Sequence, residues 1–88
     1  MFDLFRYFVH VAEEGTITAA ARRAHVTQPA LTVALHRLEA QVGTPLVVRG
    51  RPRATLTAAG SALLPHARAS LAAVRDGLRA VEEVAGLK

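Results

Sequence analysis

Apolar side chains recur every three or four residues through most of this chain, so helices must supply nearly all of its fold. The first such stretch covers residues 3–14, after which Gly15 offers a left-handed C-terminal cap. Its stripe consists of Leu4, Phe5, Phe8, Val11 and Ala12. A short second helix is expected over residues 19–24 with Thr18 as its N-cap, because its alanines let another helix approach closely.

A third helix has clear start and stop signals. Thr27 is a good N-cap, and Pro29 falls in the first helical turn, where its missing N–H costs nothing. The apolar stripe of this helix consists of Leu31, Leu35, Leu38 and Val42. Gly43 and Pro45 then end the helix. We expect the whole stripe to be buried.

The periodicity changes after the third helix. Residues 46–48 and 54–56 are expected to form two short strands, joined by a turn over residues 49–53. Strands this short are marginal unless they pack on helices. Three helices followed by two strands is the order of a winged helix-turn-helix, a mainly α fold, and we assign residues 1–58 to such a DNA-binding domain.

Residues 59–88 are expected to form a linker and dimerisation helix, with Thr57 as its cap. The apolar residues of this helix alternate steps of three and four, which is the spacing of a coiled-coil seam. They are Leu64, Ala67, Leu71, Val74, Leu78, Val81 and Ala85. A seam of three heptads is too long for one small body to cover, so a second copy of the chain is the expected partner. Packing of the stripe on the chain's own core is the alternative.

Composition narrows the function classes. The 88 residues carry a net charge of +4, which indicates an anionic partner. The chain has no cysteine and no apolar run of about 18 residues, so we expect a cytoplasmic protein that is neither exported nor bound to a membrane. Four histidines, His10, His25, His36 and His66, lack metal-ligand spacing. Since catalytic motifs are also missing, we expect no metal, no cofactor and no enzymatic activity.

Positive charge is concentrated where such a fold would meet DNA. Residues 20–53 contain six arginines and one acid, Glu39, which gives this segment +5 in a chain whose total is +4. At the tip of the third helix, Gln28 can pair with an adenine edge and Thr32 can donate or accept a hydrogen bond. Arginines in the turn can neutralise phosphates or enter a minor groove. The full set of expected DNA contacts is Thr18, Arg22, Thr27, Gln28, Pro29, Thr32, Val33, His36, Arg37, Arg49, Arg51 and Arg53.

Several stretches resemble the N-terminal domain of LysR-type transcriptional regulators, in the same order and without a gap. They include Arg6-Tyr7-Phe8-Val9, Val11-Ala12-Glu13-Glu14-Gly15-Thr16, His25-Val26-Thr27-Gln28-Pro29-Ala30-Leu31-Thr32, Leu38-Glu39, Leu56-Thr57-Ala58-Ala59-Gly60 and Leu63-Leu64-Pro65-His66-Ala67. The resemblance implies that the tip of the third helix reads the major groove of promoter or operator DNA, that the wing touches the adjacent minor groove, and that the long helix pairs two subunits. It carries Gln28, Pro29 and Thr32 over as base-reading residues, and Thr27 as a cap and phosphate contact.

The chain departs from this family pattern at a few positions. The family usually has Arg or Lys where this chain has Val33, Val47 replaces a common Phe, and Pro52 lies inside the turn. The resemblance also implies a second domain that binds a small-molecule inducer and supports tetramers, which this chain lacks. We therefore expect a piece of a longer bacterial regulator, or else a natural stand-alone domain.

Two other interpretations remain open at this point. A winged helix can serve as a protein-interaction module without sequence-specific DNA binding, because a fold does not fix a function. A regulator of the related molybdate-responsive type would share the same reading domain. The interpretation we carry forward is a homodimer that binds double-stranded DNA sequence-specifically and performs no chemistry on it.

Overall fold

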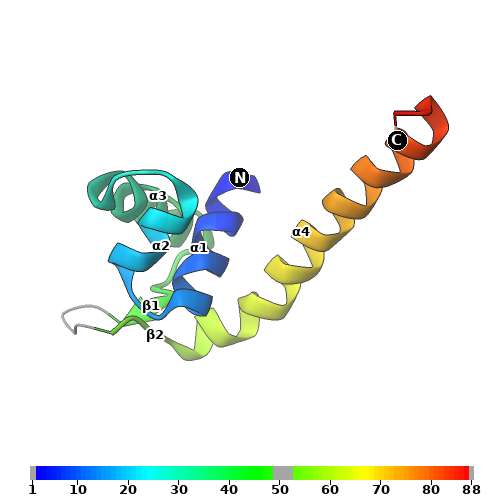
Figure 1. Cartoon of the computed structure of the whole chain (residues 1–88). Helices are drawn as coiled ribbons and strands as arrows, with labels where there is room; N and C mark the ends of the chain where they lie inside the picture. The colour runs from blue at the N-terminus through cyan, green and yellow to red at the C-terminus, as the bar shows by residue number, and fades with distance from the viewer. Residues whose placement is uncertain (1, 49–52, 88) are drawn as a thin grey trace.

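The computed structural model describes residues 2–48 and 53–87 of the chain. In order, its elements are α1 (Phe2–Glu14), α2 (Ile17–Ala24), α3 (Gln28–Val42), β1 (Val47–Val48), β2 (Thr55–Leu56) and α4 (Ala58–Ala85). Figure 1 shows α1, α2, α3 and the two strands gathered into one body, from which α4 extends outward. The predicted mainly α fold is confirmed. Within the described ranges, no helix combines the length and the apolar character needed to cross a membrane.

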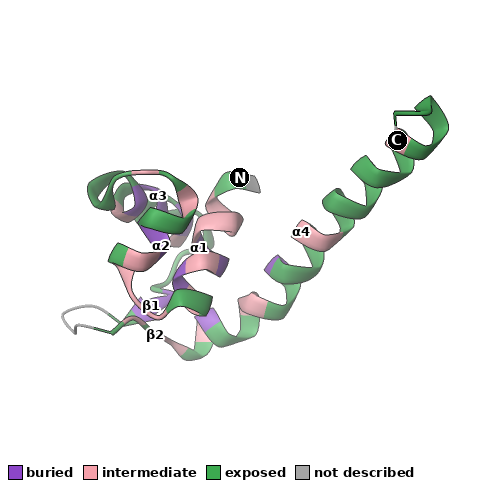
Figure 2. Ribbon diagram, viewed as in Figure 1, coloured by how far each residue is buried: buried purple, intermediate pink, exposed green. Residues whose placement is uncertain are grey.

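The core lies where the three short helices meet. Its largest fully buried side chains are Phe8, Val11, Leu31, Leu35, Leu38, Leu46 and Val47. Ala20 and Ala21 of α2 are also buried, which lets α2 pack closely against α1. Buried residues therefore line the inner faces of α1, α2 and α3, as Figure 2 shows in purple. The predicted burial of Leu31, Leu35 and Leu38 is confirmed.

Two details of the helices differ from the sequence prediction. The N-cap of α2 is Thr16 and not Thr18, because the Thr16 hydroxyl accepts a hydrogen bond from the Ala19 N–H at 3.1 Å while its backbone is extended. Thr18 instead lies exposed in the first turn of α2. The predicted burial of Val42 is also wrong: its side chain is 44% exposed. The whole end of α3 from residue 40 onward is exposed, so this turn projects past the core.

The wing is a minimal antiparallel sheet, with Val47 paired to Leu56 and Val48 paired to Thr55. A ladder of two residues is not stable by itself, so other elements must hold it. The Glu39 carboxylate of α3 accepts hydrogen bonds from the Leu46 N–H at 2.7 Å and the Val47 N–H at 3.2 Å. On the returning side, Ala54 N–H donates to the Gly15 carbonyl at 2.8 Å. Of the predicted turn, residues 49–52 lie outside the described residues.

The start of α4 is fixed against β1. The Thr57 hydroxyl accepts from the Gly60 N–H at 3.0 Å and donates to the Pro45 carbonyl at 2.8 Å, which confirms the predicted cap and adds a contact to the strand entry. A Cβ at Gly60 would collide with the Leu46 carbonyl oxygen, so only glycine permits this close approach.

The apolar stripe of α4 divides into two parts. Leu64, Ala67 and Leu71 pack on the chain's own core, and Ala67 is almost completely buried there. For these three residues the structure therefore favours the alternative of packing on the chain's own core. The remaining members, Val74, Leu78, Val81 and Ala85, are exposed in this single chain, where Figure 2 shows the outer part of α4 mostly in green.

The turn between α2 and α3 contains one residue with backbone strain, which a substitution can relieve. His25 adopts the left-handed conformation with φ 59°, the only non-glycine residue with positive φ among the described residues. Since this conformation disfavours a Cβ, we expect His25→Gly to raise the free energy of unfolding by about 0.5–1 kcal/mol and Tm by about 3–6 °C. Thermal unfolding followed by circular dichroism measures this change.

Gly43→Ala is the matched control for that prediction. Gly43 caps the other end of α3 with φ 87°, and an added Cβ would meet no atom within 4 Å, so backbone strain alone decides its effect. We expect Tm to fall by several degrees, because about 1 kcal/mol of strain is introduced. A lower Tm for His25→Gly would mean that the imidazole makes a stabilising contact larger than the strain.

The Glu39 carboxylate provides a second stability prediction. Glu39→Ala removes the acceptor of two backbone N–H groups at the buried residues Leu46 and Val47. We expect a loss of about 2–3 kcal/mol in urea unfolding, and a smaller loss for Glu39→Gln, whose amide oxygen can still accept. Glu83→Ala on the exposed end of α4 removes the same charge and should change stability by less than about 0.5 kcal/mol. Equal losses at Glu39 and Glu83 would contradict the anchoring role.

Candidate nucleic-acid interface

The unit formed by α2, a short turn and α3 holds one helix end in a fixed position. Left-handed His25 ends α2, with its N–H bonded to the Arg22 carbonyl at 3.2 Å, and Val26 N–H bonds to the Ala21 carbonyl at 3.0 Å. Thr27 then caps α3, because its hydroxyl accepts from the Ala30 N–H at 3.2 Å. Both ends of the three-residue turn are thus hydrogen-bonded, and the direction of α3 follows directly from that of α2.

The N-terminal half of α3 presents a mixed polar and apolar surface. Gln28 and Pro29 at its tip are exposed, and Val33 one turn later is 52% exposed. Thr32 is half-buried, so the residue is less accessible than the sequence implied. His36 and Arg37 continue the exposed face along the helix. The structure therefore gathers the predicted residues of the third helix on one outer side, opposite the buried leucines.

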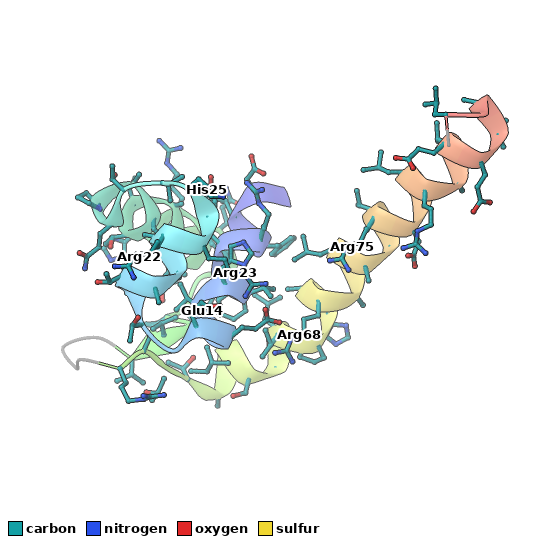
Figure 3. All side chains as sticks on the ribbon, in the orientation of Figure 1. Glu14, Arg22, Arg23, His25, Arg68 and Arg75 are labelled. Atoms are coloured by element: carbon teal, nitrogen blue, oxygen red, sulfur yellow. The ribbon has the colours of Figure 1, made fainter. Side chains whose placement is uncertain are left out.

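Helix α2 adds one free cation beside this surface. Arg22 is exposed, and no carboxylate lies within ion-pair distance of it in residues 2–48 and 53–87. Arg22 and Arg23 follow one another on α2, so their side chains leave the helix about 100° apart, and Figure 3 labels both on this helix. Thr18 is exposed on the same short helix. Arg22 and Thr18 are therefore exposed without an ion-pair partner among the described residues, whereas Arg23 is paired with Glu13 and Glu14.

One wing arginine can be placed. Arg53 is exposed, and its guanidinium lies against the turn between α1 and α2, with Nη2 at 3.2 Å from where a Cβ of Gly15 would stand. The other two predicted wing contacts, Arg49 and Arg51, lie outside the described residues, as does Pro52.

Arg23 belongs to an internal ion-pair cluster that the sequence analysis missed. Its Nη1 lies 2.8 Å from Oε1 of Glu13 and 3.1 Å from Oε2 of Glu14. The second oxygen of Glu13, Oε2, lies 3.2 Å from Nε of Arg68 on α4. Of the six arginines counted in residues 20–53, Arg23 thus balances acids outside that segment, which lowers the charge available to a ligand.

A signal for this cluster was present in the sequence. Two glutamates at the C-terminal end of a helix face the negative end of its dipole, an unfavourable position that calls for a cationic partner. The hydrogen bond from Arg23 lowers the pKa of Glu13, and the hydrogen bond from Arg68 lowers that pKa further. Glu13 and Glu14 are therefore not simply solvated at the helix end, because both are paired with arginines.

A groove of about 480 Å³ lies between α1 and the exposed part of α4. Its apolar lining includes Val9 of α1 and Leu71, Val74 and Leu78 of α4. His10 also faces it: burial lowers the pKa of its imidazole, and the charges of Arg23 and Arg6 lower that pKa further. Among the described residues, no group of histidine and acidic side chains is arranged to hold a metal ion.

Comparison with known proteins places this geometry in a family. Residues 2–61 match the family model described as "Bacterial regulatory helix-turn-helix protein, lysR family". The chain is 47% identical over 70 residues to the HTH-type transcriptional regulator TfdS of Cupriavidus pinatubonensis (strain JMP 134 / LMG 1197), an alignment that covers 80% of this chain and 24% of the relative. It is 48% identical over 67 residues to the HTH-type transcriptional regulator ClcR of Pseudomonas putida, covering 76% of this chain and 23% of the relative. The chain thus spans about a quarter of the length of these relatives.

Two solved structures of protein–DNA complexes contain domains with the same fold. The protein in the crystal structure of the CbnR_DBD–DNA complex has a TM-score of 0.84 and 42% identity, covering 96% of this chain and 98% of that one. The protein in the BenM_DBD/catB site 1 DNA complex has a TM-score of 0.93 and 29% identity, covering 97% and 94%. Since the family model covers more than half of the residues and the folds agree along nearly the whole length, this chain belongs to the lysR family of bacterial regulatory helix-turn-helix proteins.

Proposed function

We propose that this chain binds double-stranded DNA sequence-specifically, as the operator-recognition part of a LysR-type transcriptional regulator that acts as a homodimer. The observation that carries the proposal is the exposed tip of α3, which bears Gln28 while the leucines beneath it are fully buried. A helix held so firmly from below can enter a major groove without rearrangement, because its own core fixes its position. The related CbnR_DBD and BenM_DBD domains are described in complex with DNA.

Base reading is assigned to the first two turns of α3. The Gln28 amide pairs with the N6 and N7 edge of an adenine, and Thr32 contributes a hydroxyl from the rim of the core. Pro29 and Val33 contact thymine methyl groups, since both are exposed and apolar. Val33 therefore replaces the charged contact usual in the family by an apolar one.

Phosphate contacts surround this reading surface. We assign them to the exposed residues Thr18 and Arg22 of α2, to Thr27 with the Gln28 N–H at the α3 N-terminus, to His36 and Arg37 of α3, and to the wing arginines Arg49, Arg51 and Arg53. These groups bind any sequence and fix the orientation of the protein on the duplex. The protein acts by occupying DNA in the bacterial cytoplasm and not by catalysis.

Dimerisation is assigned to the outer half of α4. Val74, Leu78 and Val81 form an apolar stripe that the rest of the described chain leaves exposed. The groove beside α1 continues this stripe onto the body, since Val74 and Leu78 line both. A second copy covering the same stripe gives an isologous two-fold dimer, which presents two reading helices to two half-sites.

The reading role of Gln28 is tested against the positioning role of Arg22. With a duplex selected from a random pool by the wild-type chain, we expect Gln28→Ala to weaken binding about 5- to 150-fold and to relax one base position. Arg22→Ala should weaken the selected and random duplexes by the same factor and reduce the salt slope of log K by about one. Fluorescence anisotropy at several salt concentrations measures both.

Two outcomes would overturn these assignments. An equal loss on selected and random DNA for Gln28→Ala would remove its role in base reading. If unlabelled selected DNA competes no better than random DNA against the wild-type complex, the sequence-specific function itself is wrong, and the protein-interaction alternative takes its place.

The dimer is tested by placing a charge in the proposed seam. Leu78 is 62% exposed in the single chain, so Leu78→Glu leaves the fold intact but puts a carboxylate into the apolar interface. We expect sedimentation equilibrium to find a dimer for the wild type and a monomer for Leu78→Glu. Ala80→Glu, about 200° around the same helix, is the control that should remain dimeric. A dimer for Leu78→Glu would place the interface elsewhere.

A further inference from the structure

The direction in which α4 leaves the body is decided within its first half. Leu64, Ala67 and Leu71 pack on the core, and Leu71 and Ala72 are the last half-buried pair. From residue 73 to residue 81 every residue of α4 is exposed, so the core no longer encloses the helix there. Figure 1 shows this outer part projecting away from the body.

The Arg68–Glu13 pair is the one ion pair between α4 and the rest of the described chain, and it lies just before the helix becomes free. Apolar contacts resist separation but are non-directional. A charge-assisted hydrogen bond fixes geometry more narrowly. The Nε of Arg68 donates to Oε2 of Glu13 at 3.2 Å, so this bond restricts how α4 can swing relative to α1.

The Glu13 carboxylate is itself held in place. Its other oxygen, Oε1, accepts from Nη1 of Arg23 at 2.8 Å, and the same nitrogen binds Glu14 at 3.1 Å. One carboxylate therefore connects α1, α2 and α4. Because α2 leads directly into α3, the cluster also relates the direction of α4 to the direction of the reading helix.

We infer that Glu13, oriented by Arg23, is a positioning residue that sets through Arg68 the direction of α4, and thereby the half-site spacing that the homodimer accepts. This inference rests on the proposed function. From Arg68 to Leu78 the helix rises about 15 Å, so a swing of about 10° displaces the seam by about 3 Å. The two-fold axis doubles this displacement, to more than the rise of about 3.4 Å between successive base pairs.

The expected effect is modest, since all three side chains are partly exposed, and exposed ion pairs shift an equilibrium by about fivefold at most. A fivefold effect is too small to decide whether the chain folds. It is large enough to favour one half-site spacing over spacings that differ by one or two base pairs. Loss of the pair should therefore leave folding and single half-site binding nearly unchanged.

The experiment compares four chains on a set of duplexes. The chains are wild type, Glu13→Gln, Arg68→Ala and Arg79→Ala; the last removes an α4 arginine whose 3.2 Å ion pair, with Asp76, lies within the same helix. The duplexes carry two half-sites selected by the wild type, at the selected spacing or with one or two base pairs added or removed, together with an isolated half-site. Anisotropy titrations give the ratio of affinities between spacings.

We expect wild type and Arg79→Ala to prefer the selected spacing, and Glu13→Gln and Arg68→Ala to reduce that preference about three- to fivefold. All four should bind the isolated half-site within about twofold of one another. A fifth chain, which combines Glu13→Gln with Arg68→Ala, should lose no more preference than Glu13→Gln alone, because Glu13→Gln already removes the contact with Arg68. If Glu13→Gln fails to fold, Arg68→Ala still tests the inference, because it leaves the Glu13–Arg23 pair intact.

Retention of the wild-type preference by Arg68→Ala, or an equal loss in Arg79→Ala, would overturn the inference while leaving the proposed function standing. If the wild type binds all spacings equally, the proposal that a homodimer binds two half-sites is wrong. The positioning role of Glu13 is then wrong as well, because it depends on that dimer.

Discussion

Burial of the leucine face of α3 against α1 is the constraint on which the rest of this small fold depends. Leu31, Leu35 and Leu38 contribute three of the largest fully buried side chains, and they meet Phe8 and Val11 from the first helix. Once this face is inward, the 3.6-residue period of the helix leaves Gln28, Pro29 and Val33 outward. Burial of the leucines and exposure of the proposed DNA-reading surface are therefore one event, and a change that loosens the leucines also displaces the tip of α3.

A core this small cannot hold every element by apolar contact alone. Two carboxylates hold the remaining elements through hydrogen bonds and ion pairs. Glu39 fixes the entry of β1 by accepting two backbone N–H groups, and Glu13 joins three helices through Arg23 and Arg68. Both lie at the edge of the core, where partial exposure limits the desolvation cost of a charge. The wing and α4 are thus positioned by polar bonds to elements whose own places are set by the leucines.

The sequence predicted what depends on neighbouring residues and missed what depends on distant ones. The caps Thr27 and Thr57 are predicted correctly, because a cap and its N–H lie three residues apart. The prediction of Thr18 is wrong, since Thr16 is an equally good cap by local chemistry and occupies the position. The bond from Leu46 to Glu39 joins residues that are 7 positions apart, and the Glu13–Arg68 pair joins residues that are 55 positions apart. No local sequence pattern predicts either contact.

The long helix combines two roles that its uniform seven-residue spacing conceals. Periodicity places Ala67 and Leu78 on one stripe, yet the first is buried in its own core and the second is 62% exposed. The difference arises because the body ends where α4 passes residue 72, a length that depends on the tertiary fold and not on the stripe. The inner half of α4 therefore belongs physically to the body formed by α1, α2 and α3. The outer half is exposed in the single chain, where we propose that a second copy packs, and the Glu13–Arg68 contact lies at the boundary between the two halves.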